Sequence, residues 1–106
     1  MESSKLIMFI QVKDKGVNTL MDYYINKGKY SGVLQAYIDS VANNLAKSFI
    51  EQYQEDLKNK LVQEDIFRYL SSIGADEEYS GYRFSEALYK QLSIYVRKSN
   101  EINLLR

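Results

Sequence analysis

Apolar side chains recur every three or four residues along most of the chain, which is the period of a helix with one buried face. The longest such run extends from Ser31, a suitable N-cap, to Val62. Its apolar positions are Leu34, Ile38, Val41, Leu45, Phe49, Tyr53, Leu57 and Leu61. A helix of roughly 30 residues would be about 45 Å long, which is more than the core of a compact domain needs. We therefore expect this helix either to break near Asn43–Asn44 or to project and require a partner.

Two helices are predicted before this run. The segment Lys5–Lys13 is a short apolar run, which suits either a buried helix or a strand. No second strand-like run could pair with it, so a helix is favoured. Val17–Lys27 places its apolar residues on one helical face, between Gly16 and Gly28, and Gly28 stands where a C-cap belongs.

Two more helices are predicted after residue 62. Gln63–Ile73 is a short helix that Gly74 ends, and its inward residues are Ile66, Phe67, Leu70 and Ile73. The last helix begins near Ser80 and runs to about Ser99, which leaves NEINLLR as a tail. The chain has no Pro and only five Gly, as expected for long helices with few turns. The predicted fold class is all-α: one domain, residues 1–106, a compact bundle of four or five helices with one long central helix.

Composition excludes several kinds of function. The chain has neither Cys nor His, which removes disulfides, thiol nucleophiles, imidazole acid–base chemistry and the usual zinc ligands. Fourteen basic residues balance fourteen acidic ones, so any nucleic-acid contact must come from locally placed charge. The N-terminal apolar run is too short to span a membrane. We expect a cytoplasmic protein without a cofactor and with no evident small-molecule substrate.

Catalytic and metal chemistry are not predicted. The neighbouring acids Glu55-Asp56 and Glu64-Asp65 could in principle hold Mg²⁺. Adjacent helical residues point about 100° apart, however, so these pairs are poor chelators and are interpreted as solvated faces. An enzyme using only carboxylates, lysine, serine and tyrosine stays a remote alternative, because nothing marks an activated nucleophile.

The last predicted helix interleaves tyrosine with basic residues. Its predicted core face consists of Phe84, Leu88, Leu92 and Tyr95, with Val96 at the edge. Arg83, Lys90 and Arg97 are seven residues apart and form a predicted stripe on the outer side. Tyr82 and Tyr89 lie between the stripe and the core face. A basic stripe beside aromatic rings is typical of nucleic-acid contact, but tyrosines at the edge of a buried face have the same pattern.

A second basic segment precedes the long helix. INKGKYSG carries Lys27 and Lys29 ahead of a helix N-terminus, which is a workable anion site, but it lacks a P-loop or dinucleotide fingerprint, so an exposed loop is the favoured interpretation. The candidate nucleic-acid-binding residues are therefore Arg83, Lys90, Arg97, Lys98, Tyr82, Tyr89, Lys27 and Lys29. No catalytic or metal-binding residues are predicted.

The segment EDIFRYLSSIGADEEYSGYRFSEALYKQLSIYVRK, residues 64–98, carries a family resemblance. Its features are Glu64-Asp65-Ile66, the step from Phe67 to Leu70, Asp76, and a final helix with Leu88, Leu92 and terminal basic residues. It resembles the C-terminal part of the small helical subunit of archaeal multi-subunit (type I-A-like) CRISPR interference complexes, over about a third of the chain. The resemblance implies a non-catalytic antiviral-defence subunit, present in several copies, whose basic surface helps to hold a DNA strand.

Two functional hypotheses follow. The first is a non-catalytic helical assembly subunit, in its most concrete form the small subunit of an RNA-guided CRISPR complex that contacts nucleic-acid backbone. The alternative is a phage or archaeal-virus accessory or inhibitor protein that binds a host protein through a tyrosine-rich helical surface. The expected partners are thus a larger protein complex or a second copy of the chain, together with RNA or DNA backbone, and not a membrane.

Overall fold

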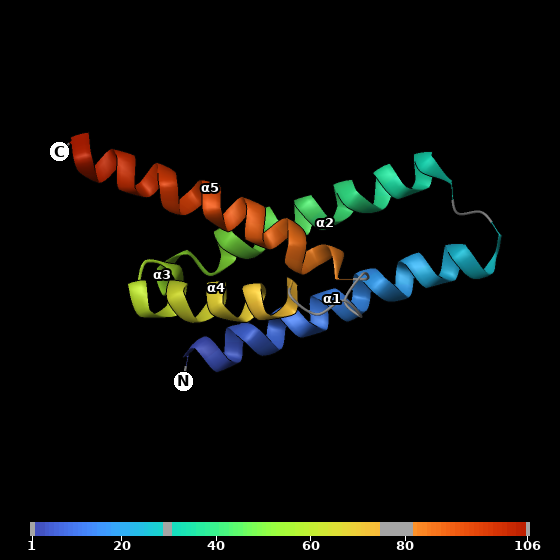
Figure 1. Ribbon diagram of the computed structural model, residues 1–106, viewed down its shortest axis with the longest axis horizontal. Helices are drawn as coiled ribbons and strands as arrows, with labels where there is room; N and C mark the ends of the chain where they lie inside the picture. Colours follow the sequence, from blue (N-terminus) through green and yellow to red (C-terminus); the bar gives the residue numbers. More distant parts are fainter. Residues whose placement is uncertain (1, 29–30, 75–81, 106) are drawn as a thin grey trace.

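The computed structural model describes residues 2–28, 31–74 and 82–105, and these residues form five helices with no strand among them (Figure 1). The helices are α1 (Glu2–Asn26), α2 (Gly32–Gln52), α3 (Gln54–Leu57), α4 (Lys60–Gly74) and α5 (Arg83–Leu105). The predicted all-α bundle is therefore confirmed, and so is the helical interpretation of the N-terminal apolar run.

The first helix is longer than predicted. α1 continues through Gly16, so the two helices expected on either side of that glycine are one. A single glycine only weakens a helix, by about 1 kcal/mol relative to alanine, and does not by itself end it. Gly28 does end the turn after α1: it adopts a left-handed φ of 67°, and its N–H donates to the carbonyl of Ile25 at 3.0 Å. The predicted C-cap is thus confirmed.

The predicted long helix is divided, but not where we expected. α2 begins after Ser31, whose hydroxyl accepts from the N–H of Leu34 at 3.4 Å, and it passes through Asn43–Asn44 without interruption. The chain then turns around α3, and Asn59 starts α4 by accepting from the N–H of Leu61 at 2.9 Å. The expected break near Asn43–Asn44 is therefore wrong, and the 30-residue helix does not form.

The turn changes which apolar residues face the core. Leu57 is fully buried, but the next predicted core residue, Leu61, is 69% exposed, and Val62 is buried in its place. Gln63 holds the turn by donating from its side-chain amide to the carbonyl of Leu57 at 2.6 Å. Within α4 the predicted inward positions Ile66, Leu70 and Ile73 are buried, and Phe67 is half-buried.

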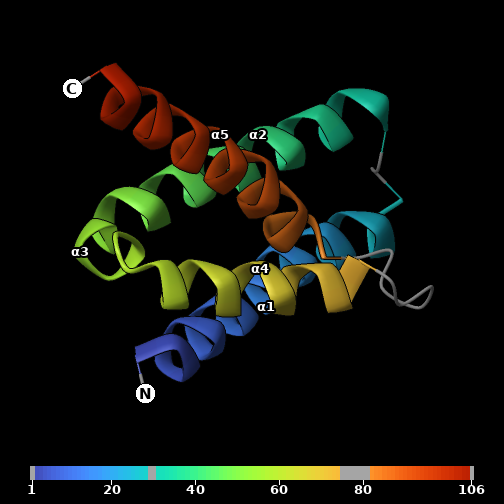
Figure 2. The ribbon, with the colours of Figure 1, turned by 60° about the vertical axis from the view of Figure 1, so that its left-hand side comes forward.

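α5 is the central packing element. It packs across α2 and α1, while α4 lies against α1 and α5 (Figure 2). Its predicted core face is confirmed, because Phe84, Leu88 and Leu92 are fully buried while Tyr95 and Val96 are half-buried. The helix extends through the predicted tail to Leu105, so the predicted end at Ser99 is wrong. The predicted start near Ser80 lies outside the described residues, as does Asp76.

Candidate functional site

The predicted basic stripe of α5 is only partly on the outer side. Lys90, Arg97 and Lys98 are exposed, but the side chain of Arg83 is only 20% exposed. Its Nη1 lies 2.5 Å from Oδ1 of Asp39 on α2, and its Nε lies 3.2 Å from Sδ of Met21 on α1. Placing Arg83 on an outward stripe was therefore wrong: it stands where α5 crosses α2, and the carboxylate of Asp39 neutralises it there.

Acidic residues share the exposed face of α5 with the remaining basic ones. Glu86 precedes Lys90 by four residues, and Glu101 follows Arg97 by four, so each pair lies on adjacent turns of the same face. All four side chains are exposed. The electrostatic character of this face is consequently mixed, which is less suited to following a phosphate backbone than an uninterrupted row of cations.

The other predicted site residues do not gather around this face. Tyr89 packs edge-to-face against Phe67, with ring centroids 5.7 Å apart, and is 46% exposed. Lys27 stands at the end of α1, with its Nζ 5.6 Å from the ring centroid of Tyr23. Figure 1 shows this end of the molecule opposite the C-terminal end of α5. Lys29 lies outside the described residues.

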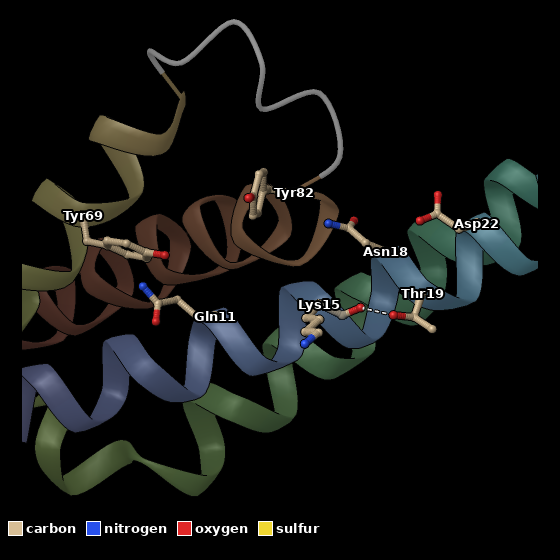
Figure 3. Close-up of a pocket in the computed structure, with 7 residues that line it drawn as sticks. All are labelled: Gln11, Lys15, Asn18, Thr19, Asp22, Tyr69 and Tyr82. Atoms are coloured by element: carbon tan, nitrogen blue, oxygen red, sulfur yellow. Dashed lines mark hydrogen bonds between the residues drawn. The ribbon is translucent and has the colours of Figure 1, made fainter.

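Tyr82 borders a polar pocket of about 440 Å³ between α1, α4 and the start of α5 (Figure 3). The pocket is lined by Gln11, Lys15, Asn18, Thr19, Asp22, Tyr69 and Tyr82. The hydroxyl of Thr19 turns back to donate to the carbonyl of Lys15 at 2.8 Å. The lining offers hydrogen-bonding groups and the phenol rings of Tyr69 and Tyr82.

A buried carboxylate joins α1 to α5. Asp14 is fully buried; its Oδ1 accepts from the N–H of Ser85 at 2.9 Å, and its Oδ2 accepts from the Ser85 hydroxyl. It thereby caps the first turn of α5 from another helix. Burial raises the pKa of Asp14 above its ordinary value, and the hydrogen bonds from Ser85 and from the Phe84 backbone oppose that rise. The sequence analysis missed this contact, although an aspartate between Ile10 and Val17 on a core face was a usable signal.

The acidic pairs Glu55-Asp56 and Glu64-Asp65 lie on α3 and α4. No group of three potential ligands comes together in the part of the chain that is described. Glu55 on α3 instead pairs with Lys58, the residue that follows α3, at 3.0 Å, and Asp65 pairs with Arg68 within α4 at 3.5 Å. Among the same residues, no helix is long and apolar enough to cross a membrane.

The structure exposes an apolar face that the sequence analysis did not identify. On α1, Met8, Val12 and Tyr23 are 54%, 62% and 56% exposed, and on α2, Val33 and Tyr37 are 83% and 54% exposed. We call these five residues and Gly16 the open face. Met8 and Val12 belong to the apolar run that the sequence pattern assigned to a buried helix, so their exposure is the unexpected observation.

The residues of the open face point away from α5. Asp14 and Asn18 lie on the side of α1 that meets α5 and the polar pocket. Val12 comes two residues before Asp14, and Gly16 comes two residues before Asn18. Because each helical residue turns by about 100°, Val12 and Gly16 lie about 200° away, on the opposite side of α1. The same spacing holds on α2, where Asp39 contacts α5 and Tyr37 comes two residues before it. Figure 2 shows α5 and α4 in front of α2 and α1.

No protein-family model, curated protein or solved structure matches the chain. The resemblance of residues 64–98 to the small CRISPR subunit therefore stays a prediction from the sequence.

Proposed function

We propose that the protein is a non-catalytic assembly subunit that acts by binding another protein through its open face. The observation that carries this proposal is the exposure of Met8, Val12, Tyr23, Val33 and Tyr37 on the faces of α1 and α2 that point away from α5. Scattered exposed apolar residues are normal on a soluble protein, but a cluster of them marks an interaction site.

The chemistry of the open face suits a protein partner. Aromatic residues and methionine are enriched in protein interfaces, and tyrosine contributes a large contact area with little loss of side-chain freedom. Polar residues, Asn44 and Ser48, continue the row of Val33 and Tyr37 along α2 and are exposed. An apolar centre with a polar edge is the usual composition of such an interface.

Site-specific photo-crosslinking in the native cells tests the proposal. A photoreactive phenylalanine analogue replaces Tyr37 on the open face, and in a matched control it replaces the exposed Ser71 on α4. We expect the Tyr37 probe to give one discrete protein adduct and the Ser71 probe to give none. Equal labelling from both positions, or no adduct from Tyr37, would contradict the proposal.

A second candidate function is contact with nucleic-acid backbone, in the form that the CRISPR resemblance implies. The observation that favours it is the exposure of Lys90, Arg97 and Lys98 along α5. The test is fluorescence anisotropy with labelled single- and double-stranded oligonucleotides over a salt series, using wild type and a variant with all three changed to Glu. Arg83 stays unchanged because its ion pair with Asp39 would otherwise confound the result. Salt-sensitive binding that is lost in the variant would support this function. Binding that the variant retains would show that Lys90, Arg97 and Lys98 are not the nucleic-acid-binding surface.

A further inference from the structure

We propose that the partner at the open face is a second copy of the chain, and that the α1 helices of the two copies cross at Gly16. This inference rests on the proposed function, whose partner it names. Three observations support it: the surface area of one copy, the position of Gly16 in α1, and the arrangement of apolar residues about that glycine.

One copy exposes more surface than a protein of its mass normally does. The accessible surface is 7339 Å² for 12.4 kDa, whereas a soluble monomer of that mass exposes roughly 6,100 Å². The excess of about 1,200 Å² exceeds the roughly 800 Å² that each partner buries in a standard interface. The radius of gyration, 15.0 Å, is likewise above the value of about 13 Å for a compact domain of this length. A dimer would bury the area that one copy leaves open.

Gly16 is unexplained by the fold of one copy. It lies inside α1, where glycine weakens a helix relative to alanine, and a Cβ built on it would meet nothing within 4 Å. It also lies in the same row as Val12 and Tyr23, four residues after the first and seven before the second. The distance between two packed helices depends on the side chains at their contact, so a glycine at that point lets two backbones approach closely.

The row along α1 is self-complementary about Gly16. Met8 comes eight residues before Gly16 and Tyr23 seven after it. In a two-fold dimer with antiparallel α1 helices crossing at Gly16, Met8 of each copy meets Tyr23 of the other. Methionine sulfur packs favourably against aromatic rings. The chain carries no net charge at pH 7, so two copies approach without long-range repulsion.

Sedimentation equilibrium of the full chain tests the inference. We compare wild type with Val12→Glu and Gly16→Leu, and use Leu61→Glu on α4 as a control because Leu61 is 69% exposed and away from the open face. Wild type and the control should have a mass of about 25 kDa, twice that of one chain. Both open-face variants should dissociate at least about tenfold more readily and keep the helical circular dichroism of wild type.

Other outcomes overturn the inference. If wild type is monomeric across the concentration series, the dimer is excluded. If Val12→Glu and Gly16→Leu dimerise as wild type does, the open face is excluded as the dimer interface. If wild type is monomeric while the Tyr37 probe still captures a different protein, self-association fails and the assembly function stands. If the Tyr37 probe gives no adduct in cells while the purified chain dimerises through Gly16, the dimer stands and the cellular assembly function fails.

Discussion

Two variants of the buried Asp14 should separate the effect of its charge on folding stability from the effect of its hydrogen bonds. Asp14→Ala removes both acceptors for Ser85 and leaves a buried N–H and a buried hydroxyl without their partner. Asp14→Asn keeps one oxygen for the N–H and presents an amide to the hydroxyl, but carries no charge. The two variants therefore differ in whether the polar groups of Ser85 stay paired.

The expected losses of stability follow from the contact between Asp14 and Ser85. An unpaired buried polar group costs about 1–3 kcal/mol, and loss of a helix cap costs about 0.5–2 kcal/mol, so Asp14→Ala should destabilise the protein by about 2 kcal/mol at pH 7. Asp14→Asn should be at least as stable as wild type, because the raised pKa means that the folded protein favours the uncharged form of this side chain.

The same pKa fixes the direction of the pH dependence. The folded state of wild type binds the Asp14 proton more tightly than the unfolded state does, so this group stabilises the fold fully below the ordinary pKa of 3.8. Its contribution is lost as the pH rises through the higher pKa of the folded state. The free energy of unfolding of wild type minus that of Asp14→Asn should accordingly fall as the pH rises above about 4, because Asp14→Asn lacks this titrating group.

Urea unfolding followed by circular dichroism measures these differences. For a slope of about 1–1.5 kcal/mol per molar urea, Asp14→Ala should lower the midpoint by about 1–2 M. Asp22→Asn, at an exposed position of α1, is the control and should leave the urea midpoint at pH 7 unchanged. If Asp14→Asn is as unstable as Asp14→Ala at pH 7, the negative charge itself stabilises the start of α5 and the argument from burial is refuted.

Two further predictions concern contacts and backbone. Arg83→Gln and Asp39→Asn should each destabilise the fold by about 1 kcal/mol. In a double-mutant cycle measured by urea unfolding, the two changes should show a coupling energy of up to about 1 kcal/mol. Additive effects would mean that the ion pair contributes nothing to stability. Gly28→Ala should lower the melting temperature because alanine is strained at a φ of 67°, whereas Gly16→Ala should raise that of the isolated chain, since its Cβ meets open space. Equal effects at the two glycines would contradict this distinction.

The helical period was sufficient to predict the core face of α5 and the inward positions of α4, because burial repeats with that period in any amphipathic helix. It was insufficient at the end of α2. The apolar spacing continues unchanged through Tyr53, Leu57 and Leu61, and only packing against the other helices decides that Val62 is buried and Leu61 is not. Local pattern therefore predicted that helices form but not where α2 ends.

The candidate site was harder to predict for the same reason. A helical projection gives the direction of Arg83 but not the presence of α2 beside it, so the ion pair with Asp39 could not be foreseen. Met8 and Val12 have the composition of core residues, and no sequence pattern states which side of α1 stays uncovered. Such features depend on contacts between residues far apart in the chain, which one sequence does not report.

The bond between Asp14 and Ser85 also bears on how the protein is made. Its two partners are 71 residues apart, and the N–H of Ser85 reaches that carboxylate only when α1 and α5 have met. During synthesis α1 emerges well before α5, so the carboxylate of Asp14 stays hydrated by water until α5 is available to cover it. We therefore expect the native state to be reached only after α5 has been translated, in one cooperative step.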